Sequence, residues 1–191
     1  MKKDAKDSIV LVAQKMFKRF GFRKTTMDEI AVAARKGKSS LYYYFKSKEE
    51  VFEAVVEMEA ETLRSDIAAK LEKCNSAMEK LRVYIFVRMD GFRNWGNFYE
   101  ALKDEYLSNY EFIEKIRIKY DRNEIETITQ IINKGIENKE FKELNAALTA
   151  KIIVTAMKGL EIPLLTENDK KTNFKKEINE MLEVLFHGIC I

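Results

Sequence analysis

The side chains best suited to chemistry lie close together, between residues 25 and 48. They are hydroxyl, ammonium and phenol groups: Thr25, Thr26, Lys38, Ser39, Ser40, Tyr42, Tyr43, Tyr44 and Lys48. Lysine ammonium groups attract phosphates, and hydroxyl groups exchange hydrogen bonds with phosphates and with base edges. The set therefore favours non-covalent recognition of a nucleic acid.

Arrangements for catalysis or metal binding are not visible in the sequence. The two cysteines, Cys74 and Cys190, are far apart and form no C-x-x-C pattern, and His187 is the only histidine. These residues make neither a recognisable cysteine–histidine nucleophile pair nor a metal cluster. We expect no enzymatic activity, no metal and no cofactor. Two distant cysteines also fit a reducing cytosol.

The first helix-start signal in this segment is Thr26. Glu29 follows three residues later, which is the spacing of a capping box, in which the hydroxyl and the carboxylate each satisfy a backbone N–H group. An apolar stripe of small side chains, which lets a second helix cross closely, follows at Ile30, Ala33 and Ala34. The sequence Arg35-Lys36-Gly37 should end this helix, with Gly37 taking the positive φ of a sharp turn.

A second, very short helix is expected next. Ser39 can cap it, and Leu41 and Phe45, four residues apart, should point into the core. This leaves its Lys, Ser and Tyr side chains mostly outward. Ser47 and Glu50 then form another capping box, which starts a long helix. Two short helices that cross on small residues have the outline of a helix-turn-helix, whose second helix enters the DNA major groove.

Several anchors in the first 55 residues match one known family in type and spacing. They are Phe17, Phe20-Gly21-Phe22, Thr25-Thr26, Glu29-Ile30-Ala31, Ala34, Leu41-Tyr42-Tyr43-Tyr44-Phe45 and Lys46-Ser47-Lys48-Glu49. In these residues the chain resembles the DNA-binding domain of the tetracycline-repressor (TetR) family of bacterial regulators. The turn departs from the family pattern, since Ala34-Arg35-Lys36-Gly37 replaces Ala-Gly-Val-Ser, and Tyr44 stands where the family often has histidine.

The resemblance implies which residues contact the DNA backbone. Lys38 and Lys48 would neutralise phosphates, and the N-terminus of the helix begun at Ser47 would bind one more. Thr25 and Thr26 would donate hydrogen bonds to the backbone, which positions the domain without reading sequence.

The same resemblance implies which residues read the bases. Those near enough to discriminate among base edges would be Lys38, Ser39, Ser40 and Tyr42, and the hydroxyls of Tyr43 and Tyr44 would serve phosphates or bases. Lys36 has no family counterpart in this role and is a candidate for an extra phosphate contact. The alternative is that the three tyrosines pack against neighbouring helices.

The composition favours a globular protein that is nearly all helix. The 191 residues suffice for one large or two small domains, and a hydrophobic share of 46% can build a core. The chain has one proline and seven glycines, with abundant Lys, Glu, Ile and Ala. No run of 18 apolar residues is present, so we expect no membrane span. The N-terminal MKKDAKD is not followed by an apolar segment of signal-peptide length, so we expect no signal peptide.

The charges are divided unevenly along the chain. Residues 1–50 hold 13 Lys+Arg and 6 Asp+Glu, a balance of +7, whereas residues 51–191 hold 21 and 25, a balance of −4. A basic head on a mildly acidic body is expected if only the head meets phosphates. A solvated basic face is the alternative.

Apolar periodicity predicts about nine helices and no strand. Besides the two short helices, four are expected at residues 4–20, 47–73, 76–93 and 98–106. A long helix should run from residue 109 to a break near 135–138. The last two should run from a cap at Asn145 to Pro163, and from residue 172 to Gly188. We expect an all-α fold with a three-helix DNA-binding domain, residues 1–50, and a helical effector-binding and dimerisation domain, residues 51–191. By the family pattern, the helix from Ser47 joins the two.

The middle of the body is rich in large side chains that could enclose a ligand. The resemblance places an effector pocket in this region, and the candidates are Tyr84, Met89, Phe92, Trp95, Phe98, Tyr99, Tyr106 and Tyr120. No Arg or Lys recurs on the inferred inner face, which favours a neutral or lipid-like effector, and we expect an apolar or aromatic small molecule. Aromatic residues at helical spacing more often form core than pocket, so plain packing is the alternative for each of them.

The resemblance also implies a homodimer formed by the last two helices, paired in a four-helix bundle. Ala150, Ala156 and Gly159 would allow close approach of the partner. Dimer symmetry in turn predicts an inverted-repeat operator. Closure of the monomer's own core by these helices is the alternative.

The sequence therefore predicts a cytoplasmic, nucleoid-associated transcriptional regulator, a dimeric repressor released from its operator by a small-molecule effector. An all-helical lipid-binding protein with a basic head that contacts membranes is the rival from another class. That rival does not explain the spacing of residues 25–48. A DNA-bound regulator of a non-transcriptional process would use the same fold.

Overall fold

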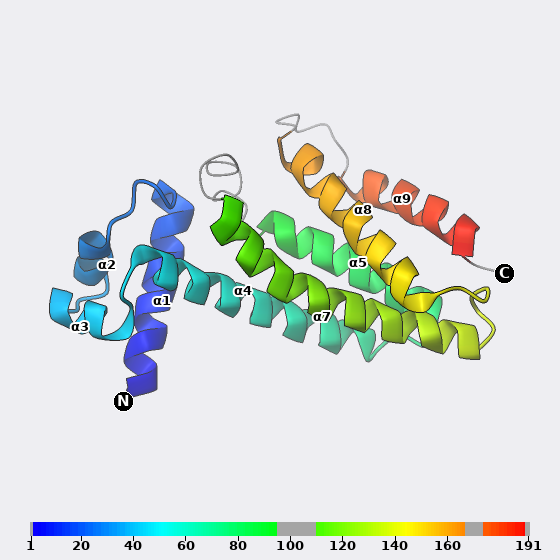
Figure 1. The fold of residues 1–191 in the computed structure, drawn as a ribbon, viewed down its shortest axis with the longest axis horizontal. Coiled ribbons are helices and arrows are strands. Elements are labelled where there is room, and N and C mark those ends of the chain that lie inside the picture. Colours follow the sequence, from blue (N-terminus) through cyan, green and yellow to red (C-terminus); the bar gives the residue numbers. More distant parts are fainter. Residues whose placement is uncertain (1, 95–109, 167–173, 190–191) are drawn as a thin grey trace. The chain divides into compact units, whose positions relative to one another are not determined.

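The computed structural model describes residues 2–94, 110–166 and 174–189, and these ranges are helical with no β-strand (Figure 1). The helices are α1 (Lys2–Phe20), α2 (Met27–Ala33), α3 (Lys38–Tyr44), α4 (Lys48–Leu71), α5 (Ala77–Asn94), α7 (Tyr110–Glu137), α8 (Ala146–Thr166) and α9 (Phe174–Ile189). The all-α prediction is confirmed. The short helix expected at residues 98–106 lies outside the described residues.

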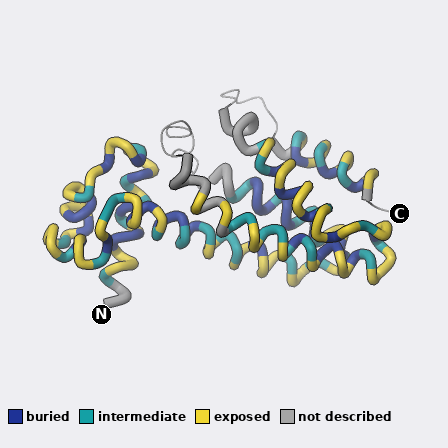
Figure 2. Tube along the Cα trace, in the orientation of Figure 1, coloured by how far each residue is buried: buried dark blue, intermediate teal, exposed yellow. Residues whose placement is uncertain are grey.

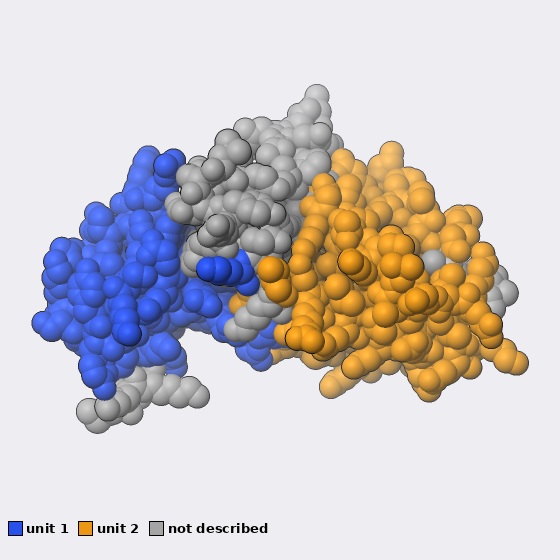
Figure 3. Space-filling model, in the orientation of Figure 1, with its two compact units in different colours: residues 1–64, 94–116 blue, residues 65–93, 117–191 orange. Residues whose placement is uncertain are grey.

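The chain divides into two compact units (Figure 3). Residues 1–64 and 94–116 form the first unit, and residues 65–93 and 117–191 form the second. Helices α4 and α7 each contribute residues to both units.

In the first unit, α2 packs against both α1 and α3. Three buried rings, Phe17, Phe22 and Phe52, form the aromatic centre, with centroids 4.9 to 5.5 Å apart. Further buried side chains come from all four helices and include Ile9, Ala13, Ile30, Leu41, Phe45, Val51 and Val55. This core fixes how the short helices α2 and α3 are presented.

The predicted helix starts are largely confirmed. Thr26 and Glu29 form the complete capping box of α2. At α4, the Ser47 hydroxyl accepts from the Glu50 N–H (3.3 Å), but the Glu50 carboxylate accepts from the N–H of Lys46 (2.7 Å) instead of from the cap residue. Asn145 caps α8, because its Oδ1 accepts from the Leu148 N–H (3.0 Å).

The second unit has an aliphatic core, visible as the buried stretches of α5, α7, α8 and α9 in Figure 2. Its fully buried members include Leu81, Ile85, Ile128, Ile132, Phe141, Met157 and Ile178. Gly135, near the end of α7, lies against the ring of Phe141, and a Cβ added to Gly135 would overlap that ring. This close approach explains the glycine at that position.

Two predicted helix ends in this unit are wrong. Helix α8 continues through Pro163 to Thr166, and α9 continues through Gly188 to Ile189. Proline removes one helical hydrogen bond, and here the helix tolerates that loss and continues for three more residues. Within residues 2–94, 110–166 and 174–189, no helix combines the length and apolar character needed to cross a membrane.

Candidate nucleic-acid interface

The turn between α2 and α3 is closed by backbone hydrogen bonds around Arg35. The Arg35 N–H donates to Val32 O (3.0 Å) and the Lys36 N–H donates to Ala31 O (2.9 Å), which is the Schellman pattern of helix ends. This pattern places its left-handed residue at Arg35, with φ 52°. Arg35 thus occupies the position where the family pattern has glycine.

The residues after this turn differ from the sequence prediction. Gly37 has an ordinary φ of −65° and is itself the N-cap of α3, without a side-chain hydrogen bond. The predictions that Gly37 takes the positive φ and that Ser39 caps the helix are therefore wrong. Because Ser39 is not used as a cap, its hydroxyl lies on the exposed surface of α3.

Helix α3 has one buried side and one exposed side. Leu41 is fully buried and Phe45 follows at 3% exposure, as predicted. On the opposite side, Tyr42 and Tyr43 are 43% and 68% exposed. Exposed or half-buried positions complete this side at Lys38, Ser39, Ser40 and Tyr44. The structure thus contradicts the alternative of internal packing for Tyr42 and Tyr43, while Tyr44 is half-buried.

The ammonium group of Lys38 is paired with Asp28, at the start of α2. The Nζ–Oδ2 distance is 2.9 Å, and both side chains are largely exposed. The hydrogen bond to the Asp28 carboxylate raises the pKa of Lys38. The pair joins the beginning of α3 to the beginning of α2, and its exposure leaves the ammonium accessible to an anion.

The two threonines before α2 serve the fold in different ways. Thr25 is 1% exposed, and its hydroxyl donates to Gly21 O (2.8 Å), so the DNA contact predicted for Thr25 does not fit its buried position. Thr26 is exposed, and its hydroxyl hydrogen-bonds to Glu29. The hydrogen bonds from Thr26 lower the pKa of the Glu29 carboxyl.

Lys48, the first residue of α4, reaches back to the loop between α1 and α2. Its Nζ donates to Phe22 O (2.8 Å) and approaches Arg23 O (3.5 Å). It also lies 4.3 Å from the centroid of the Phe22 ring. Arg23 and Lys24 are exposed in the same loop and were not among the predicted site residues, although their charge beside Thr25-Thr26 was the available signal.

Three of the residues predicted to line an effector pocket lie in the second unit. Tyr84 and Met89 are buried, at 4% and 3% exposure, and Tyr120 is half-buried. Burial, reinforced by the nearby Glu124 carboxylate, raises the pKa of Tyr84. The side chain of Phe92 and the residues Trp95, Phe98, Tyr99 and Tyr106 lie outside the described part of the structure.

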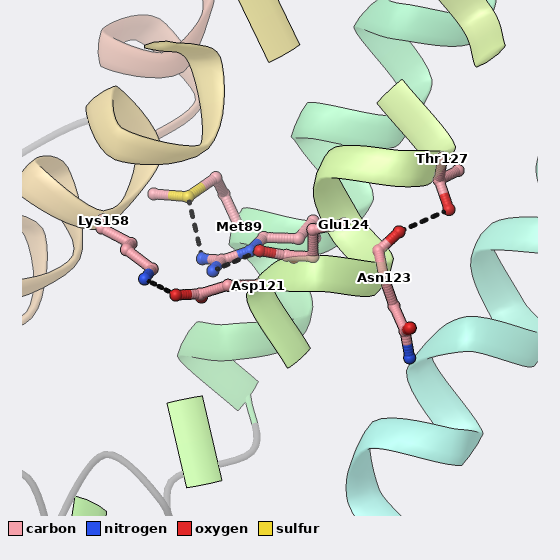
Figure 4. Close-up of polar contacts among 7 residues, drawn as sticks. Met89, Asp121, Asn123, Glu124, Thr127 and Lys158 are labelled. Carbon is pink, nitrogen blue, oxygen red and sulfur yellow. Dashed lines mark hydrogen bonds and ion pairs between the residues drawn. The ribbon is translucent and has the colours of Figure 1, made fainter. Parts of the chain in front are cut away.

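Buried charge accompanies these residues, contrary to the prediction of an inner face without Arg or Lys. Arg88 of α5 is 6% exposed and makes two hydrogen bonds to Glu124 of α7, at 2.7 and 3.2 Å. A second ion pair, Lys158 with Asp121, joins α8 to α7 (Figure 4). The prediction failed because the two members of each ion pair lie 36 and 37 residues apart in the sequence, so no local pattern shows that they pair.

A groove of about 490 Å³ lies elsewhere in the second unit. Its walls come from the end of α4, the start of α5 and the second half of α7, and include Leu71, Ser76, Lys80, Gln130, Ile131 and Lys134. None of the predicted effector residues lines this groove.

Three comparisons place the chain among known proteins. The family model described as bacterial regulatory proteins, tetR family, matches residues 9–55. The HTH-type transcriptional regulator QacR of Staphylococcus aureus (strain Mu50 / ATCC 700699) is 25% identical over 186 residues, which cover 96% of this chain and 97% of QacR. The biofilm operon icaADBC HTH-type negative transcriptional regulator IcaR of Staphylococcus aureus (strain Newman) is 26% identical over 134 residues, 69% of this chain and 67% of IcaR.

The resemblance extends to a solved structure. The crystal structure of a transcriptional regulator from Cytophaga hutchinsonii ATCC 33406 has a TM-score of 0.81 and 29% identity, and covers 96% of this chain and 97% of that chain. The matched family segment begins inside α1, ends inside α4 and contains the whole turn between α2 and α3. Residues 9–55 thus match the TetR family of bacterial regulatory proteins, and over nearly its whole length the chain is similar to transcriptional regulators.

Proposed function

We propose that this protein is a DNA-binding regulator of transcription that acts as a homodimeric repressor and leaves its operator when a small molecule binds. The observation that carries the DNA-binding part is the exposed side of α3, where hydroxyl, phenol and ammonium groups lie opposite the buried Leu41. Such a side suits the major groove, because it offers hydrogen-bonding groups together with exposed aromatic rings.

The charge of the proposed DNA-binding domain, residues 1–50, supports the same role. Its balance of +7 contrasts with −4 for residues 51–191, the proposed effector-binding and dimerisation domain. Lys38 can exchange Asp28 for a phosphate, since the pair is exposed and an exposed ion pair contributes little. Thr26, Tyr44 and Lys48 complete the proposed backbone contacts, and Ser39, Ser40, Tyr42 and Tyr43 face the bases.

Exposed apolar side chains on the last two helices support a dimer. Leu148 and Ile152 of α8 are 55% and 58% exposed, and Val184 of α9 is 77% exposed. Ala156 and Gly159 are also exposed on α8 and allow close approach of a partner, but Ala150 is fully buried in its own unit, so that part of the prediction is wrong. A symmetric dimer would read an inverted repeat, with its heads roughly 34 Å apart or a multiple of that.

The effector is proposed to bind in the body, near the buried residues of α5 and α7. Tyr84 and Met89 offer apolar surface, and the Arg88–Glu124 pair adds buried polar groups, so an aromatic effector with a polar substituent suits the described residues. To displace the protein from DNA, the effector must bind the non-DNA state more tightly, by typically about 1–3 kcal/mol of coupling. We also propose that the protein represses transcription, which is supported by the name of IcaR, a negative transcriptional regulator. Its proposed location is the cytoplasm, beside the chromosome.

The test is selection of duplexes from a randomised pool by the full-length protein, followed by binding titrations at several salt concentrations. We expect an enriched inverted repeat and a log K that falls linearly with log salt. Parallel titration with anionic vesicles addresses the lipid-binding rival. Binding to vesicles and no preference among duplexes would refute the proposal.

A change in fluorescence of Trp95, the only tryptophan, on titration with candidate aromatic compounds would identify effectors.

A further inference from the structure

The exposed side of α3 lacks the side chains that most often read guanine and adenine. Its sequence, KSSLYYY, contains no Arg, Asn or Gln. Arginine or lysine makes two hydrogen bonds to guanine, and Asn or Gln makes two to adenine. The one cation of α3, Lys38, is assigned to a phosphate in the proposed function. Direct reading of purine edges by this helix is therefore limited.

What the helix presents instead is aromatic surface. Tyr42 and Tyr43 are the exposed large apolar side chains of α3, at 43% and 68%. The Tyr43 ring stands edge-on to the half-buried Tyr44 ring, with 5.1 Å between centroids and an interplanar angle of 86°. This contact restrains the Tyr43 ring before DNA arrives, which lowers the entropy cost of using it.

Only one apolar group is displayed by the bases in the major groove, the C5 methyl group of thymine. The ring carbons of an exposed tyrosine can cover that methyl group, as other apolar side chains do. The hydroxyls of Ser39 and Ser40 can meanwhile bond to acceptors such as thymine O4. Aromatic rings beside small hydroxyls thus match thymine better than any other base.

Building on the proposed function, we propose that Tyr42 and Tyr43 read thymine C5 methyl groups, so that the operator segment under α3 consists of A·T pairs. Specificity then depends on methyl contacts more than on bidentate hydrogen bonds. The partner chemistry is a B-form duplex with thymine methyl groups at fixed positions in each half-site.

The experiment replaces thymine by deoxyuridine, which removes the methyl group and keeps the hydrogen-bonding edge. The probe is the duplex that the full-length protein selects from a randomised pool, substituted one thymine at a time in both half-sites. Loss of one methyl contact should weaken binding about fourfold, and about sixteenfold when both half-sites lose it. 5-Bromodeoxyuridine, with a bromine of about methyl size, should restore the affinity.

Protein variants assign the effect to the tyrosines. Y43F keeps the ring and should keep the preference for thymine over uracil, whereas Y42A and Y43A should each lose it at one position. Thymines outside the half-sites are the control and should tolerate uracil. If an alanine variant does not fold, the uracil series with the unaltered protein still decides.

Two results would overturn the inference while leaving the proposed function intact. One is a specific duplex in which every thymine tolerates uracil within about twofold. The other is a selected half-site without A·T pairs at its conserved centre. A protein that prefers no duplex at all would refute the proposed function as well, and the two failures are thereby distinguished.

Discussion

The ammonium of Lys48 donates a hydrogen bond to the backbone carbonyl of Phe22 over 2.8 Å. The same group lies 4.3 Å from the centre of the Phe22 ring, which packs between Phe17 and Phe52. The start of α4 is thereby connected to the loop that precedes α2. Lys48 consequently has a role in the protein alone, in addition to the proposed phosphate contact.

We predict that Lys48→Ala weakens binding to all duplexes and flattens the plot of log K against log salt by about one unit, because one phosphate contact is lost. In the absence of DNA, the amide protons around Phe22 should exchange faster in this variant, because the loop has lost its anchor. Lys46→Ala, at an exposed neighbouring position, is the control for both measurements. An unchanged salt slope with faster exchange would assign Lys48 to loop positioning alone.

The protein should be more stable with glycine in place of Arg35. Its φ of 52° costs a residue with a Cβ about 1–2 kcal/mol, and glycine avoids this cost at the expense of some chain entropy. We expect Arg35→Gly to raise the free energy of unfolding in urea by up to about 1 kcal/mol. Lys36→Gly, where φ is not positive, should lower it instead. Equal effects of the two substitutions would contradict the assigned turn.

Gly135→Ala should destabilise the second unit. The added methyl would overlap the Phe141 ring, and overpacking of this kind typically costs about 1–3 kcal/mol. Thermal unfolding measures the effect, and the smaller side chain of Phe141→Leu in the same protein should recover part of the loss. A fully stable Gly135→Ala protein would show that the ring can move aside easily.

Local signals explain why the helix starts could be predicted. A capping residue and its carboxylate or amide partners lie within four residues, so Thr26, Ser47 and Asn145 were recognisable without tertiary information. The exposed side of α3 followed similarly from the spacing of Leu41 and Phe45.

Features that depend on the residue at which a helix ends, or on contacts across the chain, could not be predicted in the same way. The positive φ belongs to Arg35 because the hydrogen bonds that close α2 require it there, whereas residue type pointed to Gly37. The Arg88–Glu124 pair joins two helices, and no local pattern indicates which helices will be neighbours. Pro163 shows that a strong helix-breaking signal can be overridden, since α8 runs on to Thr166.

Ile152→Glu should convert the proposed dimer into monomers. Ile152 is 58% exposed on α8, and a carboxylate there would be desolvated in a symmetric interface. Light scattering or analytical ultracentrifugation measures the mass. Ile118→Glu, at 60% exposure on α7, is the matched control and should leave the mass unchanged. Loss of dimers in both variants, or in neither, would place the interface elsewhere.

Arg88→Leu should destabilise the second unit far more than the loss of an exposed ion pair. The side chains of Arg88 and Glu124 are 7% and 15% exposed, and removal of one partner from a buried pair leaves an uncompensated charge, at a cost of about 3–5 kcal/mol. Arg82→Leu breaks the exposed pair with Glu183, at 41% and 53% exposure, and should change the free energy of unfolding by less than about 1 kcal/mol. Replacing Glu124 by leucine together with Arg88 should recover most of the stability, since no charge then remains buried. If Arg88→Leu and Arg82→Leu lower the free energy of unfolding in urea by the same amount, water reaches the Arg88–Glu124 pair. The contribution of this pair to effector binding should then be small as well.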